Sequence, residues 1–144
     1  MQWINGLNSN LPNDISVVDV DRVEDSFHSR FDAIDRTYSY LIFNSSSRNV
    51  LLDDFYYWEH SELDINKMKE ESKHLIGKHD FTSFRSLSCG SNNPERNVKK
   101  IEINKFGDII EIKITANAFL QNRVRIIVGT LLEIGKYQIK ISLK

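Results

Sequence analysis

The chain has 144 residues, of which 40% are hydrophobic and 27% charged, and a formal net charge of −1. This length fits one domain, or parts of two, and the composition is that of a soluble globular protein rather than a disordered or fibrous one. No apolar run approaches the ~20 residues of a membrane span, a single cysteine excludes an internal disulfide, and the first residues lack a signal-peptide pattern. A cytoplasmic location is predicted.

The small net charge conceals two halves of opposite sign. Residues 1–35 hold seven acidic side chains against two arginines, whereas residues 90–144 hold ten lysines and arginines against five acids. A basic half can bind a polyanion such as RNA, but a solvated basic face is the more common cause of such a bias. Charge alone leaves both interpretations open.

Two strands are predicted in the first third of the chain. Residues 16–23 alternate polar and apolar side chains in part, and residues 36–43 alternate clearly. In the second strand Tyr38, Tyr40 and Ile42 share one face. A tyrosine at such a position is usually a core residue, but its ring can also stack on a base.

A helix is predicted over residues 64–76, with Asp64 as its N-cap and Gly77 at its C-terminal end. Residues 78–97 then form a long predicted loop rich in serine, glycine and asparagine. Loops of that length within a compact domain are usually functional or disordered.

The last third of the chain predicts a β-hairpin and a second helix. Residues 98–104 and 109–115 alternate isoleucines with polar side chains around a short turn, and residues 119–134 have apolar side chains at helical spacing. Strand, strand, helix, hairpin and helix in this order indicate an α+β fold, an antiparallel sheet covered by helices.

Two arginines, Arg123 and Arg125, flank the apolar stripe of this last helix. One interpretation is that both cover the core with their stems and keep their heads in water. The other is that one of them points into a cleft and pairs with a carboxylate or a phosphate, which a planar guanidinium suits well. Spacing alone favours the first interpretation.

The segment 77–85, GKHDFTSFR, combines aromatic rings with a histidine, an aspartate and an arginine. It is either a loop anchored by its phenylalanines or an RNA-contacting loop. Cys89 and His79 could be drawn as a nucleophile and its base, but a thiol without an orienting partner is usually inert. The four histidines lack metal-ligand spacing, so no metal site is predicted.

Four blocks together carry a resemblance to a known family. They are LNSNLPNDI at 7–15, FHSRFDAIDRTYSY at 27–40, GKHDFTSFR at 77–85 and ANAFLQNRVRIIVGTLLEIG at 116–135. Their order and approximate spacing resemble the bacterial tRNA pseudouridine synthase A family, over nearly the whole chain up to Gly135. Four blocks in order are far more specific than any one motif.

The resemblance implies isomerisation of uridine to pseudouridine in the anticodon stem-loop of tRNA, without a cofactor or a metal. It implies an aspartate nucleophile, a homodimer, and two α/β halves related to the RRM or ferredoxin-like fold, with a basic cleft between them for RNA. The target base must leave its stack before a carboxylate can reach it, which costs a few kcal/mol.

Five residues of this chain take roles from the resemblance. Tyr38 matches the tyrosine that packs on the target uracil, and Arg125 matches the helix arginine that pairs with the catalytic aspartate. Phe119 opens the same helix near the cleft. Arg85 and His79 lie in a matching block and are predicted to contact the substrate, without a defined chemical role.

One block of the family pattern is not found in this sequence. The nucleophile of the family lies in an Arg-Thr-Asp-x-Gly-Val-His block upstream of the LNSNLP segment, and these 144 residues contain no such block. We therefore expect an incomplete synthase: residues 1–24 as the end of an N-terminal half and linker, 25–135 as the domain with the tyrosine and arginine, and 136–144 as an atypical tail. Such a chain is predicted to be inactive alone. The alternatives are a non-catalytic RNA-binding remnant and a dimerising fragment joined through an exposed sheet edge.

Overall fold

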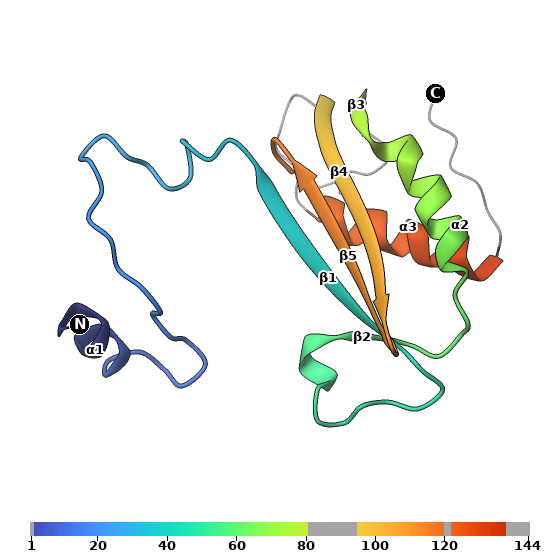
Figure 1. Ribbon diagram of the computed structural model, residues 1–144, viewed down its shortest axis with the longest axis horizontal. Coiled ribbons are helices and arrows are strands. Elements are labelled where there is room, and N and C mark those ends of the chain that lie inside the picture. Colours follow the sequence, from blue (N-terminus) through green and yellow to red (C-terminus); the bar gives the residue numbers. More distant parts are fainter. Residues whose placement is uncertain (1, 81–94, 120–121, 138–144) are drawn as a thin grey trace. The chain divides into compact units, whose positions relative to one another are not determined.

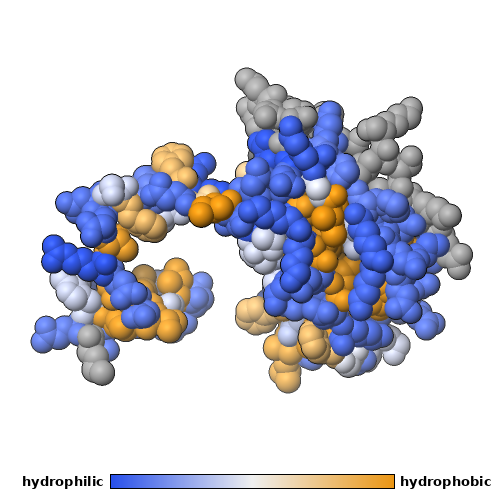
Figure 2. Space-filling view, turned by 45° about the horizontal axis from the view of Figure 1, so that its top comes forward, coloured by the Kyte–Doolittle hydropathy of each residue, from blue (hydrophilic) through white to orange (hydrophobic). Residues whose placement is uncertain are grey.

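The computed structural model describes residues 2–80, 95–119 and 122–137, which belong to two compact units, Met1–Ala33 and Ile34–Lys144. The first unit contains the helix α1 (Gln2–Asn8) and an irregular segment, and no residue of α1 is buried. Trp3 is 77% exposed and Val18 is 88% exposed. Figure 2 shows hydrophobic side chains at the surface of this unit.

The predicted strand at residues 16–23 is wrong, because this segment is irregular in the structure. A strand needs a neighbouring strand to pair its N–H and C=O groups. Here the side chain of Asn8 takes that place: Val17 N donates to Asn8 Oδ1 at 2.7 Å, and Asn8 Nδ2 donates to Val17 O at 2.9 Å. Alternating polar and apolar residues indicate a preference for the strand conformation, but a strand also needs a neighbouring strand to pair with.

The second unit is built on a five-stranded sheet with the order β2-β1-β5-β4-β3 (Figure 1). In chain order its strands are β1 (Arg36–Asn44), β2 (Tyr57–Glu59), β3 (Gly77–Asp80), β4 (Glu95–Phe106) and β5 (Ile109–Ala116). β1 pairs with β2 in parallel, whereas all other neighbours are antiparallel.

The predicted hairpin is confirmed as β4 and β5, which are longer than expected. Phe106 pairs with Ile109 across the turn, where Gly107 has a φ of +59° that favours glycine. The predicted loop at 78–97 is wrong at both ends. Residues 77–80 form β3, and β4 already begins at Glu95; residues 81–94 lie outside the described part of the chain.

Two helices cover one face of the sheet, α2 (Ile65–Ser72) and α3 (Arg123–Tyr137) (Figure 1). Short 3₁₀ turns, η1 (Asp53–Phe55) and η2 (Lys73–Leu75), complete the elements. The predicted cap of α2 is confirmed, because Asp64 Oδ1 accepts a hydrogen bond from Lys67 N at 3.0 Å.

The core lies between this face of the sheet and the two helices. Alternate residues of β5 enter it, and so does the apolar stripe of α3. Its fully buried members are Ile42, Met68, Leu75, Ile110, Ile112, Ile114, Ala116, Ile127, Leu131 and Ile134. Each isoleucine, leucine or methionine of this set stabilises the fold by roughly 1.5–3 kcal/mol when its side chain leaves water.

The predicted α+β class is confirmed: the second unit has a mixed sheet, antiparallel apart from β2, with helices on one face. Within the described ranges, no helix is long and apolar enough to cross a membrane.

The C-terminal part of α3 packs tightly against α2. A Cβ atom added at Gly135 would lie 2.9 Å from Met68 Sδ and 3.1 Å from Leu63 Cδ2, and both of those residues are buried. At Gly129, in the same helix, an added Cβ meets nothing within 4 Å. An alanine at Gly135 therefore tests both close packing and helix propensity, whereas an alanine at Gly129 tests helix propensity alone.

We predict opposite effects for Gly135→Ala and Gly129→Ala. Overpacking costs about 1–3 kcal/mol, which exceeds the gain of about 0.5–1 kcal/mol that alanine brings to a helix, so Gly135→Ala lowers the free energy of unfolding. Gly129→Ala gains helix propensity without overpacking, so it raises the free energy of unfolding. Urea unfolding of both variants measures the difference, and equal stabilities would contradict this packing.

Candidate functional site

A pocket of about 460 Å³ lies between β1 and the start of α3. Both walls belong to the second unit. The strand contributes Tyr38, Ser39 and Tyr40, the residues before α3 contribute Phe119 and Asn122, and the first turn of α3 contributes Arg123, Val124 and Arg125. Three of the five residues predicted to act on a substrate, Tyr38, Phe119 and Arg125, therefore meet here.

Two aromatic rings form one side of the pocket. The rings of Tyr38 and Phe119 lie 5.1 Å apart at an angle of 89°, an edge-to-face contact. Phe119 packs against the core, whereas Tyr38 is 50% exposed. The contact restrains the orientation of Tyr38, whose exposed surface can receive a planar ligand.

The two arginines of α3 have different environments. Arg123 is only 1% exposed, so the expectation that it keeps its head in water is wrong. Two residues span about 200° of a helix, so Arg125 leaves α3 on nearly the opposite side. Arg125 is exposed, and its Nη1 lies 3.5 Å from Asn122 Oδ1.

The other two predicted residues do not line this pocket. His79 lies on β3, where its Nε2 is 2.9 Å from the carbonyl oxygen of Ile76. Arg85 lies outside the described residues, as does Cys89. The last helix was predicted over residues 119–134, but α3 begins only at Arg123, so the expectation that Phe119 opens it is wrong. Asn122, inside the predicted helix, is a typical cap residue directly before the observed one.

The pocket wall holds cationic and aromatic side chains, and none of the described residues that line it is acidic. A buried carboxylate does exist elsewhere in the unit, since Glu59 is 2% exposed. Glu59 pairs with Asn44, six residues along β1 from Tyr38. At about 3.3 Å per residue this separation is about 20 Å, too far for a shared reaction centre.

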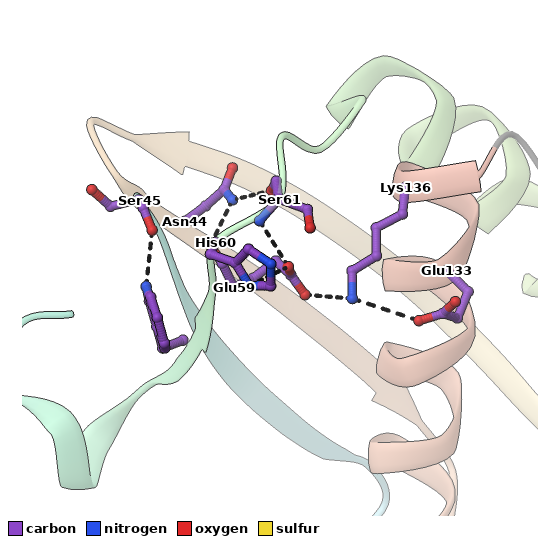
Figure 3. A network of polar contacts seen from close by, with 8 residues as sticks. Asn44, Ser45, Glu59, His60, Ser61, Glu133 and Lys136 are labelled. Carbon is purple, nitrogen blue, oxygen red and sulfur yellow. Dashed lines mark hydrogen bonds and ion pairs between the residues drawn. The ribbon is translucent and has the colours of Figure 1, made fainter. Parts of the chain in front are cut away.

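Glu59 belongs to a polar network that joins β2 to α3 (Figure 3). Its Oε2 lies 2.5 Å from Lys136 Nζ, and its Oε1 accepts a hydrogen bond from Ser61 N at 2.9 Å. Asn44 Nδ2 donates to the carbonyl oxygens of Glu59 and Ser61 at 3.0 and 2.7 Å. Each side-chain oxygen of Glu59 thus has a partner.

The network shifts both of its charged groups toward ionisation. Burial alone would raise the pKa of Glu59, but the hydrogen bonds from Lys136 and Ser61, with the charge of Lys136, lower it below its ordinary value. The hydrogen bond to Glu59 raises the pKa of Lys136, against a smaller opposing effect of burial. A carboxylate held in this way anchors the short β2 strand and is poorly suited to nucleophilic attack.

Across residues 2–80, 95–119 and 122–137, no three His, Cys, Asp or Glu side chains are grouped so that they could hold an ion. The described side chains that line the pocket offer two phenols, one aliphatic hydroxyl, two guanidinium groups and an amide.

Comparison with known proteins places this site in a family context. The family model described as "tRNA pseudouridine synthase" matches residues 72–143. The chain is 44% identical over 133 residues to "tRNA pseudouridine synthase A" of Francisella tularensis subsp. novicida and to that of Francisella philomiragia subsp. philomiragia. Each match covers 92% of this chain but 52% of the relative. The chain thus spans about half the length of these curated relatives.

The network predicts a pH-dependent effect of Glu59→Gln. Because the pKa of Glu59 is lowered from 4.5 in the folded state, its stabilisation is complete well above pH 4.5 and is lost as the pH falls through the folded value. At pH 7 the variant leaves the partly buried cation of Lys136 with only the half-exposed Glu133 beside it, and the free energy of unfolding falls by about 3 kcal/mol.

Glu133→Gln is the matched control, since Glu133 is half exposed and lies 3.6 Å from the same lysine. It should cost less than about 1 kcal/mol. Denaturant unfolding between pH 3.5 and 7 gives both values. A Glu59→Gln penalty that stays constant as the pH falls below 4.5 would disprove the proposed role of the ion pair.

Proposed function

Because the chain belongs to the tRNA pseudouridine synthase family, we propose that the pocket of Tyr38, Phe119 and Arg125 receives a uridine of tRNA for isomerisation to pseudouridine. The observation that carries the proposal is the meeting of a half-exposed tyrosine ring and an exposed arginine in one pocket. A ring stacks on a uracil that has left its helix, and a guanidinium binds an anionic oxygen.

Tyr38 and Arg125 have distinct parts in this proposal. Tyr38 packs on the uracil, with Phe119 holding its ring in place, and its hydroxyl is positioned to assist a proton transfer. Arg125 pairs with a catalytic aspartate and keeps it ionised and oriented. The uracil is detached, turned and re-joined to the ribose through a ring carbon, so no atom is gained or lost.

The described residues that line this pocket do not supply the aspartate. None of the described lining residues is acidic, Glu59 is already paired with Lys136, and the 144 residues contain no Arg-Thr-Asp-x-Gly-Val-His block. We therefore propose that these residues form the substrate-binding half of an active site and are inactive alone. An absent nucleophile cannot be replaced by the tyrosine and the arginine.

The wider expectations remain part of the proposal. Arg85 and His79 are proposed RNA contacts, and the protein is proposed to act in the cytoplasm as a homodimer. The outer edge of β1 supports edge pairing of two copies, because β2 covers only residues 42–44, whereas β5 covers residues 36–43 of the same strand. Sedimentation of a monomer at all accessible concentrations would contradict the dimer.

The function is tested by measuring pseudouridine in unmodified tRNA. We expect no turnover by the chain alone, and turnover when it is mixed with the N-terminal half of the Francisella tularensis relative. Arg125→Lys keeps the charge but loses the planar fork, so it should slow the mixture roughly 10- to 100-fold. Arg48→Lys, a matched change at an exposed arginine paired with Asp53, should leave the rate unchanged.

Each outcome has a definite meaning. Turnover by the chain alone would contradict its proposed inactivity. Salt-dependent tRNA binding without turnover by the mixture would replace the proposal with a non-catalytic RNA-binding remnant. No tRNA binding at low salt would overturn both.

A further inference from the structure

Asn122, the residue before α3, has an unusual backbone. Its φ is +60°, the only positive value at a non-glycine residue in the described part of the chain. Its carbonyl oxygen accepts the hydrogen bond of Ile126 N at 3.1 Å, which makes it the N-cap of α3. Asparagine tolerates this left-handed conformation better than most residues, but it is not the usual backbone of an N-cap.

The side chain of Asn122 lies beside that of Arg125. Residues three apart lie on the same side of a helix, and Asn122 Oδ1 is 3.5 Å from Arg125 Nη1. Both residues line the pocket beside Tyr38. We propose that Asn122 is a positioning residue, which holds the Arg125 guanidinium toward the pocket so that it can pair with the catalytic carboxylate. This inference rests on the function proposed above.

The contact between Asn122 and Arg125 is weak enough for a carboxylate to replace it. A separation of 3.5 Å exceeds the 2.7–3.2 Å of an ordinary N–H···O bond, so the amide restrains Arg125 only weakly. A charge-assisted hydrogen bond to a carboxylate is roughly twice as strong as a neutral one, so a carboxylate that binds Arg125 replaces the contact with the Asn122 amide. A guanidinium has five N–H donors, and the amide leaves a complete two-donor edge available.

Asn122 favours the reaction by restraining the Arg125 side chain before the carboxylate binds. A long arginine side chain loses rotamer freedom when it is fixed, and this cost falls on the binding step unless it has been met beforehand. Asn122 narrows the range of Arg125 in the unliganded protein. The reaction therefore gains from the Asn122 amide through its effect on Arg125.

Asn122→Gly isolates the side chain from the backbone. Glycine adopts a φ of +60° without strain and is an acceptable N-cap, so the fold should keep its stability. In the 144-residue chain, nuclear magnetic resonance of the arginine side chains should show faster rotation of the Arg125 guanidinium in this variant. The signals of Arg48, held by Asp53, should not change and provide an internal control. Unchanged Arg125 signals would overturn this inference alone.

A double-mutant cycle tests the consequence for catalysis in the mixture with the N-terminal half of the relative. Asn122→Gly should lower the rate only about twofold, because the contact that it removes is long and weak, and it should leave the tRNA affinity unchanged. In the Arg125→Lys background it should have no further effect, because the amide acts through the guanidinium. An equal loss in both backgrounds, or a parallel loss of tRNA affinity, would overturn the positioning role. A wild-type mixture without turnover would overturn the proposed function and the catalytic part of this inference with it.

Discussion

The burial of the apolar stripe of α3 in the same core as the isoleucines of β5 is the interaction on which the rest of the second unit depends. Ile127, Leu131 and Ile134 are fully buried, and truncating any one of them to alanine would cost about 2–5 kcal/mol. A helix held along one stripe cannot rotate. Its first turn is therefore fixed as well, with Arg123 inside and Arg125 at the pocket beside Tyr38.

Local patterns in the sequence predicted those parts of the fold that local physics controls. The strand β1, the alternating burial of β5 and the cap at Asp64 appear in the structure, although burial along β1 does not alternate. β2 was not predicted, since three residues carry little pattern and its position depends on a parallel partner. The strand predicted at 16–23 failed for the same reason, because pairing is a property of two segments rather than of one.

The site was predictable in part. The resemblance named Tyr38, Phe119 and Arg125, and the structure brings these three to one pocket, although it does not test their roles. Helical spacing placed both arginines at the edge of the apolar stripe, yet Arg123 is buried, because its environment is set by tertiary packing around the start of α3. The part played by Asn122 depends on a backbone angle that no composition rule supplies.

The central claim is that the pocket of Tyr38, Phe119 and Arg125 receives the target uridine. It is tested most directly by photo-cross-linking the chain to a tRNA whose anticodon stem-loop uridines are replaced by 4-thiouridine, followed by mass spectrometry of the cross-linked peptide. We expect cross-links to Tyr38 or Phe119 that disappear with an excess of unlabelled tRNA. Competed cross-links confined to other elements, with none at these two rings, would contradict it.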